Sequence, residues 1–341
     1  MAHLEARRHI SPDSGFHVTL HPHFNEKIRH HIPPEPIREA FAPPKDRVQL
    51  SQLDEKQLDE LALLVNERGV VFFRDQDLTT EQQIKLFEHY GVLDRHPAQK
   101  DQKFVNIKGS REDHREILKF TPWPSGDFHA DTSFEINPPS YSLLRMEEHP
   151  AVGVSQYGLY DALSKAYQTF LDGLHAVHTS RLQYDTILDL WGTGPNRPPI
   201  DTHHPAVRTH PVTGLKALNV NPGFVTGFAE LKKLESGGIP GPNETDNPLI
   251  FCLDKILEFL AYHIHSADDH YVRFKWAVGS VAMWDNRCTL HRVIPGTYKG
   301  ERRGIRTTVF GEKPYFDPES ESREQRWARE RQNAGPADGA E

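Results

Sequence analysis

The sequence predicts a mainly β fold with flanking helices, such as an all-β sandwich or barrel decorated with helices. Several short segments have the apolar pattern of strands, and "YVRFKW" at 271–276 alternates with period two. Long irregular connections separate these segments, and helical periodicity is limited to a few stretches between them. Many short strands joined in this way are typical of sandwiches and barrels.

The chain begins with residues 1–45, which are rich in His and Pro without a clear period and predict an irregular N-terminal arm. An amphipathic helix is predicted over 51–68, because apolar residues recur on one face. Ser51 can cap this helix and Gly69 can end it.

A short strand and a second helix complete a compact opening unit. The apolar run "VVFF" at 70–73 predicts a buried strand. Residues 79–91 predict a helix that begins with a capping box between Thr79 and Gln82 and ends at Gly91.

The middle and the C-terminal part supply the other predicted strands, which lie at 141–146, 215–221, 271–276, 280–286 and 306–312. Helices are expected at 161–173 and 253–266. The Gly/Pro-rich stretch 236–248 reads as an insertion within a domain that covers 46–316. Residues 317–341 are charged and weakly apolar, which predicts a disordered tail.

Composition favours an intracellular protein, most simply a cytoplasmic one. The net charge of −8 argues against a nucleic-acid partner, because no basic excess exists to neutralise phosphates. Two cysteines, Cys252 and Cys288, are too few for a disulfide framework. No apolar run approaches the roughly 18 residues of a membrane span, and the N-terminus lacks the apolar core of a secretory signal. The oligomeric state stays open, a homo-oligomer included.

The stretch "FHADT" at 128–132 contains a His-x-Asp doublet, His129 and Asp131. With 21 His and 48 acidic residues among 341, random placement supplies about three His-x-acid triplets, and three occur. The doublet therefore carries meaning only if its context does. In a strand, residues two apart present their side chains on the same side of the chain.

Residues near the C-terminus could complete a metal site. Two His and one carboxylate on one face of a ferrous ion leave three positions open for oxygen and a cosubstrate. His291 follows a predicted strand and is the candidate third ligand, and Asp285 and Asn286 are expected to fix the turn before it. Arg302 and Arg306 follow, four apart, and would share one face of an extended strand. A guanidinium suits bidentate recognition of a carboxylate.

Longer segments of the chain resemble the taurine/sulfonate dioxygenase (TauD/TfdA-like) family of Fe(II)- and 2-oxoglutarate-dependent dioxygenases, fungal members included. They are "VVFFRDQDLTTEQQ", "FHADTSFEINPPSYSLLRM", "HPAVRTHPVTGLKALNVNPGF" and "MWDNRCTLH", in family order between about residues 50 and 316. "VRTHPVTG" and "WDNR" are much more specific than His-x-Asp. The resemblance implies a double-stranded β-helix, or cupin-like jelly roll.

The resemblance also implies roles for individual residues. The implied iron(II) ligands are His129, Asp131 and His291. Arg302 would pair with the far carboxylate of 2-oxoglutarate, and Arg306 would face the anionic head of the substrate and also the cosubstrate. The implied substrate pocket contains His96, Thr132 and Phe224 besides Arg306. The cosubstrates would be 2-oxoglutarate and O2, and the substrate a small anionic organic molecule, first of all a sulfonate that yields sulfite and an aldehyde.

The sequence departs from the family pattern in two places. Family members carry a Thr-bearing "GGDTLW"-like segment after the strand that matches "LLRMEEHP", and its Thr binds the cosubstrate. Here about five residues are missing between Gly153 and Val154, and Ser155 is the only nearby hydroxyl. Gln99 and Ser125 stand where the sulfonate-specific members have Tyr and Asn.

These departures leave alternatives open. The same chemistry could act on a sulfate ester, an aryloxyacetate or another small acid. The chain could also be a non-catalytic relative impaired by the missing Thr segment, or the product of a gene model with intron errors. A zinc hydrolase could use two His and an Asp, but it would leave the downstream Arg pair without a role.

Overall fold

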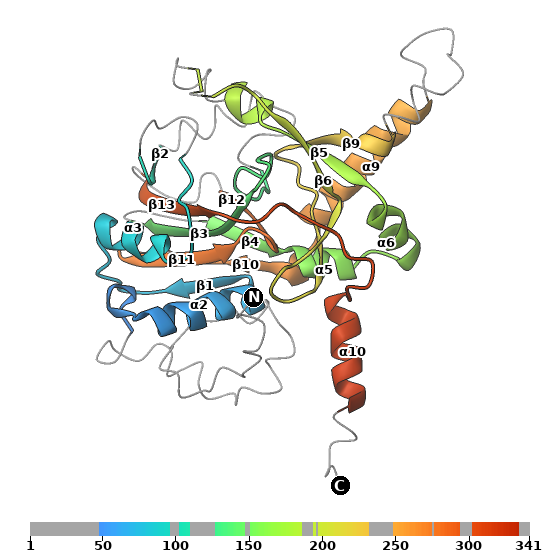
Figure 1. Ribbon diagram of the computed structural model, residues 1–341. Helices are drawn as coiled ribbons and strands as arrows, with labels where there is room; N and C mark the ends of the chain where they lie inside the picture. The colour runs from blue at the N-terminus through green and yellow to red at the C-terminus, as the bar shows by residue number, and fades with distance from the viewer. Residues whose placement is uncertain are drawn as a thin grey trace.

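The computed structural model of the chain describes residues 48–95, 102–109, 127–146, 151–185, 194–195, 197–231, 248–274, 276–293 and 302–333. Antiparallel sheets form its centre, and helices lie around them (Figure 1). The prediction of a mainly β protein with flanking helices is confirmed at this level.

The largest sheet has five strands. Their order is β1 (Val70–Phe73), β11 (Ser280–Asp285), β3 (Pro139–Met146), β13 (Arg302–Phe310) and β2 (Val105–Gly109). Every neighbouring pair is antiparallel. The predicted strands at 70–73, 141–146 and 280–286 are therefore confirmed, and the strand predicted from residue 306 begins at Arg302.

Three smaller antiparallel sheets complete the β structure. In the first, the strand order is β10 (Tyr271–Arg273), β4 (Ala151–Ser155) and β12 (Thr289–Val293). In the second, it is β6 (Asp201–Pro205), β5 (His175–Thr179) and β9 (Val225–Phe228). The third pairs β7 (Val207–Thr209) with β8 (Lys216–Leu218).

Eight helical segments surround the sheets in the described ranges. They are η3 (Leu50–Gln52), α2 (Glu55–Arg68), α3 (Thr80–Glu88), α5 (Gln156–Asp161), α6 (Lys165–Asp172), α9 (Pro248–His265), η5 (Asp268–His270) and α10 (Arg323–Asn333). None of the helices in these ranges combines the length and apolar character that crossing a bilayer requires.

Strand alternation divides the five-stranded sheet into two buried faces. One face packs under α2 and α3, and its core includes Val71, Leu143 and Met283. The opposite face carries Phe72, Leu144 and Trp284, which pack with Val272, Phe274 and Trp276 from β10 and the residues after it. The sheet that contains β10, β4 and β12 therefore packs against this face of the five-stranded sheet through β10.

Three local predictions need correction. Helix α2 begins after Asp54, whose side chain forms a capping box with Gln57, so Ser51 is not its cap. The helix predicted over 161–173 begins only at Lys165, because Ser164 caps it, and Asp161 is instead the last residue of a separate helix, α5.

The third correction concerns the C-terminal tail. Residues 323–333 form α10 instead of a disordered segment. Arg323 forms an ion pair with Asp161 on α5, at 3.3 Å, and Arg326 donates a hydrogen bond of 2.6 Å to the Thr213 carbonyl. A mainly charged helix is thus held by ionic and polar contacts, which a count of apolar residues does not register.

Candidate metal centre

A short β-bridge joins the two histidines of the candidate site. The His129 amide donates to the His291 carbonyl at 3.0 Å, and the His291 amide donates to the His129 carbonyl at 2.8 Å. His291 lies within β12, and His129 precedes the turn that carries Asp131. The bridge therefore aligns two segments that lie far apart in the sequence.

This alignment brings three candidate ligands together. One ligand atom from each of His129, Asp131 and His291 lies within 4.8 Å of the other two. The two imidazole rings are 4.4 Å apart between centroids, and His291 Nε2 is 3.7 Å from Asp131 Oδ1. His129 and Asp131 alone could be a chance doublet, but His291, the predicted third ligand, lies beside them.

His129 presents one nitrogen to the other two side chains. Its Nδ1 is 2.6 Å from the Asp127 carbonyl oxygen, which can only accept, so Nδ1 carries the proton and Nε2 is the donor atom left for a metal. Burial lowers the pKa of His129, although the Asp131 carboxylate opposes this shift. The ring is therefore neutral near pH 7, as a metal ligand must be.

Asp131 is held by both carboxylate oxygens. The Ser142 hydroxyl donates a hydrogen bond of 2.6 Å to Oδ2, and Arg306 Nη1 donates to Oδ1. Burial opposes ionisation of this carboxyl, but the interactions with Arg306, His291 and His129 and the Ser142 hydrogen bond lower its pKa to about 2. An ionised carboxylate beside two imidazole rings is the donor set that suits a non-haem ferrous ion.

Arg306 comes to the site from β13. It pairs with Leu144 on β3, and Leu144 belongs to the face that looks toward the second sheet. Arg302 begins the same strand, where its backbone pairs with Gly109 of β2. The Arg302 side chain lies outside the described part of the structure.

The missing segment near Ser155 does not interrupt β4. This strand pairs with β12 over five residues, and Gly153 lies directly opposite His291. Ser155 ends the strand and caps α5, where its hydroxyl accepts from the Gly158 amide at 3.4 Å. The strand and Arg302 belong to different sheets, so the shortened segment at β4 does not alter the strand order of the sheet that carries Arg302.

The predicted substrate-pocket residues are placed in part. Phe224 is buried, and its ring meets His129 edge-on at 5.8 Å between centroids. Thr132 is buried with a φ of 35°, which a β-branched residue rarely adopts, so the turn after Asp131 is strained. His96, Gln99 and Ser125 lie outside the described residues.

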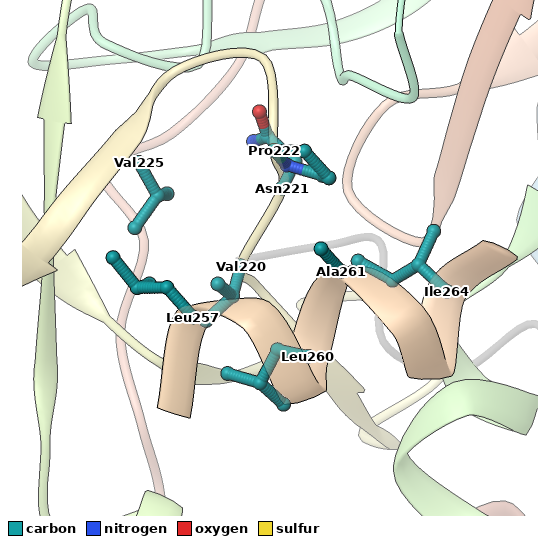
Figure 2. A pocket seen from close by; sticks show the side chains of 8 residues that line it. All are labelled: Val220, Asn221, Pro222, Val225, Leu257, Leu260, Ala261 and Ile264. Carbon is teal, nitrogen blue, oxygen red and sulfur yellow. The ribbon is translucent and has the colours of Figure 1, made fainter. Parts of the chain in front are cut away.

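Helix α9 supports the segment that carries Phe224. Asn221 Oδ1 accepts the Phe224 amide at 3.0 Å and so fixes this turn. Behind the turn lies a small, mostly apolar cavity between α9 and the segment 220–225 (Figure 2). Its walls are Val220, Asn221, Pro222, Val225, Leu257, Leu260, Ala261 and Ile264. Helix α9 thus lies across this cavity from the segment 220–225, which contains Phe224.

A second group of potential ligands, His210, Asp285 and Cys288, is fully buried. His210 Nδ1 accepts from the amides of Val212 and Thr213, at 3.2 and 3.1 Å. The proton therefore lies on Nε2, which donates to Asp285 Oδ2 at 3.0 Å. Both ring nitrogens are engaged, so this cluster is a structural network. It fixes the turn before β12, as the sequence predicts for Asp285.

Sequence reasoning did not find Ser142. It lies inside the predicted strand 141–146, where one Ser among apolar residues gives no functional signal. Its role becomes visible only when the register of β3 places it beside Asp131. Asn286 was expected only to fix a turn, but it also accepts the Asp131 amide at 3.1 Å.

Known proteins resemble this chain over most of its length. The family model "Taurine catabolism dioxygenase TauD, TfdA family" matches residues 34–308. The "Alpha-ketoglutarate-dependent sulfonate dioxygenase" of Saccharomyces cerevisiae is 33% identical over 284 residues, which cover 79% of this chain and 65% of the yeast protein. The "Alpha-ketoglutarate-dependent dioxygenase oryG" of Aspergillus oryzae is 34% identical over 309 residues, with 79% and 83% covered.

Among solved structures, a taurine dioxygenase from Burkholderia xenovorans is similar, with a TM-score of 0.61 and 28% sequence identity. The match covers 80% of this chain and 88% of the bacterial protein. The resemblance drawn from the motifs is thereby confirmed. On the extent of the family match and the identity to the fungal relatives, this chain belongs to the TauD, TfdA family of dioxygenases.

Proposed function

We propose that this chain uses Fe(II), 2-oxoglutarate and O2 to hydroxylate a small organic sulfonate on a double-stranded β-helix scaffold. The observation that carries the proposal is the meeting of His129, Asp131 and His291 within 4.8 Å, with Arg306 in contact with the same carboxylate. When bound, ferrous iron would supply oxygen activation, which no side chain can provide. We also propose a cytoplasmic location.

Different residues would bind the metal, the cosubstrate and the substrate. His129, Asp131 and His291 would hold the metal. Arg302 would pair with the far carboxylate of 2-oxoglutarate, and Ser155 is the remaining candidate for a hydroxyl contact to it. Arg306 would pair with the anionic head of the substrate, because a buried guanidinium favours a sulfonate oxygen or carboxylate.

The remaining pocket residues would shape the substrate site. Phe224 would exclude water from its apolar side, where its ring already covers His129. Thr132 and His96 would complete the binding of the sulfonate, Thr132 through its backbone.

The overall reaction balances without another oxidant. One oxygen atom of O2 would enter succinate as 2-oxoglutarate loses CO2, and the other would enter the C–H bond beside the sulfonate. The resulting α-hydroxysulfonate would then break its C–S bond to give an aldehyde and sulfite. The name of the yeast relative supports a sulfonate as substrate, whereas the name of the Aspergillus relative specifies none.

Anaerobic titration with Fe(II) and 2-oxoglutarate tests the proposal first. We expect the weak visible charge-transfer band of the chelate, then oxygen-dependent succinate and sulfite with one member of a panel of sulfonates. Succinate without sulfite would redirect the substrate to the sulfate esters or aryloxyacetates in the same panel. His291→Ala should abolish turnover.

A pair of neighbouring arginines tests the cosubstrate assignment. Arg302→Met should raise the KM for 2-oxoglutarate by on the order of a hundredfold, because a charge-assisted contact is lost. Arg303, an exposed residue on the same strand, serves as the matched control, and Arg303→Met should change KM little. Equal effects of the two substitutions would contradict the register that we assign to β13.

One observation favours a second candidate, a non-catalytic relative that binds metal or ligand. The β4 position opposite His291 is Gly153, and the Ser155 hydroxyl already caps α5. If the Ser155 hydroxyl serves only as this cap and does not donate to the cosubstrate, the hydroxyl contact of the family is lost. Metal binding with no band and no succinate would favour this candidate over the enzyme.

A further inference from the structure

Asn286 makes every polar contact that its side chain allows. Its Oδ1 accepts two N–H groups, from the Asp131 backbone at 3.1 Å and from Trp284 Nε1 at 3.0 Å. Its Nδ2 donates to the Ser142 hydroxyl at 2.9 Å and to the Ser140 carbonyl at 3.4 Å. Because two N–H donors face one end of the amide, the orientation of the amide is determined by its partners.

The same side chain also controls the direction of the next hydrogen bond. The Ser142 hydroxyl accepts a hydrogen bond from Asn286 Nδ2, so its own hydrogen is available to donate to Asp131 Oδ2 at 2.6 Å. With Oδ2 engaged, Oδ1 is the oxygen that faces His291 Nε2 at 3.7 Å. Asn286 thus acts on Asp131 twice, at its backbone amide directly and at its carboxylate through Ser142.

Trp284 extends the network to a second ligand. Its ring lies 4.8 Å from the His291 ring between centroids, at an interplanar angle of 54°. The hydrogen bond from Nε1 to Asn286 holds that ring in place. Both side chains are buried, with 6% of Trp284 and 4% of Asn286 exposed, so solvent cannot replace their contacts.

We infer that Asn286 is a positioning residue that sets the mutual geometry of Asp131 and His291, through Ser142 on one side and Trp284 on the other. This inference rests on the proposed function, in which those two residues are metal ligands. The side chain of Asn286 contacts the backbone of one proposed ligand, Asp131, and two residues, Ser142 and Trp284, that each contact a proposed ligand in turn. Partners of this kind orient ligands and commonly contribute about 10-fold to 100-fold to metal affinity.

Fe(II) binding measured anaerobically by calorimetry tests the inference. Asn286→Ala should weaken Fe(II) binding by about 10-fold to 100-fold. Asn286→Asp should weaken it comparably, because an ionised carboxylate keeps the acceptor atoms but cannot donate to Ser142. Trp284→Phe and Ser142→Ala each remove one link, so each should have a smaller effect of at least a few-fold.

A second readout separates positioning from stability. Asn66 is a control, since it is also buried and its Oδ1 accepts from the Tyr141 hydroxyl and from Arg287, neither of which is a proposed ligand. Asn66→Ala should lower the thermal midpoint as Asn286→Ala does, yet keep the wild-type Fe(II) affinity. The charge-transfer band of the Fe(II)–2-oxoglutarate complex should shift in Asn286→Ala and stay unchanged in Asn66→Ala.

The possible results distinguish failure of this inference from failure of the proposed site. Wild-type Fe(II) affinity and band in Asn286→Ala, with binding that still depends on His291, would overturn the positioning role alone. Fe(II) affinity that His291→Ala leaves unchanged would overturn the metal site and this inference with it. If Asn286→Ala does not fold, wild-type affinity in both Ser142→Ala and Trp284→Phe would overturn the inference.

Discussion

At the scale of single residues, a glycine determines how closely the chain can approach a ligand. Gly223 lies in the turn between Asn221 and Phe224, and a methyl group built on it would lie 3.0 Å from the His129 Cβ. A contact this short is tighter than most Cβ contacts, so one of the two groups must give way by a few tenths of an ångström. The position of His129 therefore depends on the absence of a side chain at residue 223.

Gly223→Ala should displace His129 and weaken Fe(II) binding by on the order of tenfold. Gly173→Ala is the control, because a methyl group at that position would meet no heavy atom within 4 Å. Anaerobic metal titration of both variants measures the difference. Wild-type affinity in Gly223→Ala would mean that the turn relaxes without moving the ligand.

The sequence indicated the candidate metal ligands, but not the residues that hydrogen-bond to them. His129, Asp131, His291 and Arg306 carry chemistry that a motif reveals, and the structure brings them together. Ser142 and Asn286 are ordinary polar residues whose contacts depend on the register between β3, β11 and β13. Register is a tertiary property that the short strand segments leave unspecified.

At the scale of elements, polar side chains decide boundaries that apolar periodicity predicts only roughly. Asp54 forms a capping box with Gln57 and begins α2, three residues after the predicted cap at Ser51. The box at Thr79 and Gln82 was predicted correctly, since its spacing is itself a sequence pattern.

Asp54→Ala should reduce the free energy of unfolding by about 1 kcal/mol, because it leaves amides of the first turn of α2 without an acceptor. Ser51→Ala should change it by less than about 0.5 kcal/mol, since the Ser51 hydroxyl only contacts Asp77 in an exposed pair. Urea unfolding of both variants measures the two effects. The reverse order would restore Ser51 as the cap.

Some strands could not be predicted because their buried face is polar. In β6, Thr202 and His204 point inward, and exposed residues alternate with them. Thr202 donates to the Phe134 carbonyl at 2.9 Å, and His204 Nε2 lies 2.8 Å from the Glu135 carbonyl. A pattern search for apolar alternation does not detect such a strand, although its geometry is regular.

At the scale of the whole molecule, the prediction of a mainly β fold with flanking helices holds. The order of the strands within each sheet could not be predicted from the sequence. Neighbours such as β1 and β11 pair across more than two hundred residues of chain. The local apolar pattern shows that a strand exists and which face it buries. It does not show which distant strand supplies the edge that completes its hydrogen bonds.

Buried histidines should make the whole molecule sensitive to acid. Burial lowers the pKa of His178, His204 and His210, that of His204 to about 4. The unfolded chain protonates these rings near their ordinary value of 6.5, whereas the folded chain does so only at lower pH. Stability is therefore full above about pH 6.5 and is lost as the pH falls toward 4.

Urea unfolding at pH 7.5 and pH 5 should differ by about 2 kcal/mol from His204 alone, with the lower stability at pH 5. His204→Gln should reduce that difference, even if it lowers stability at both pH values. A free energy of unfolding that is constant across this range would contradict the assignment of neutral, buried rings.

The β-bridge between His129 and His291 has a consequence for how a metal would act on the chain as a polymer. The two residues are about 160 positions apart, so closing that loop carries a large entropic cost. The two backbone hydrogen bonds and the sheets around them are protein contacts that offset this cost without a metal–ligand bond. A metal at this site would therefore add little to the closure of this loop. We expect the fold to persist when the metal is removed.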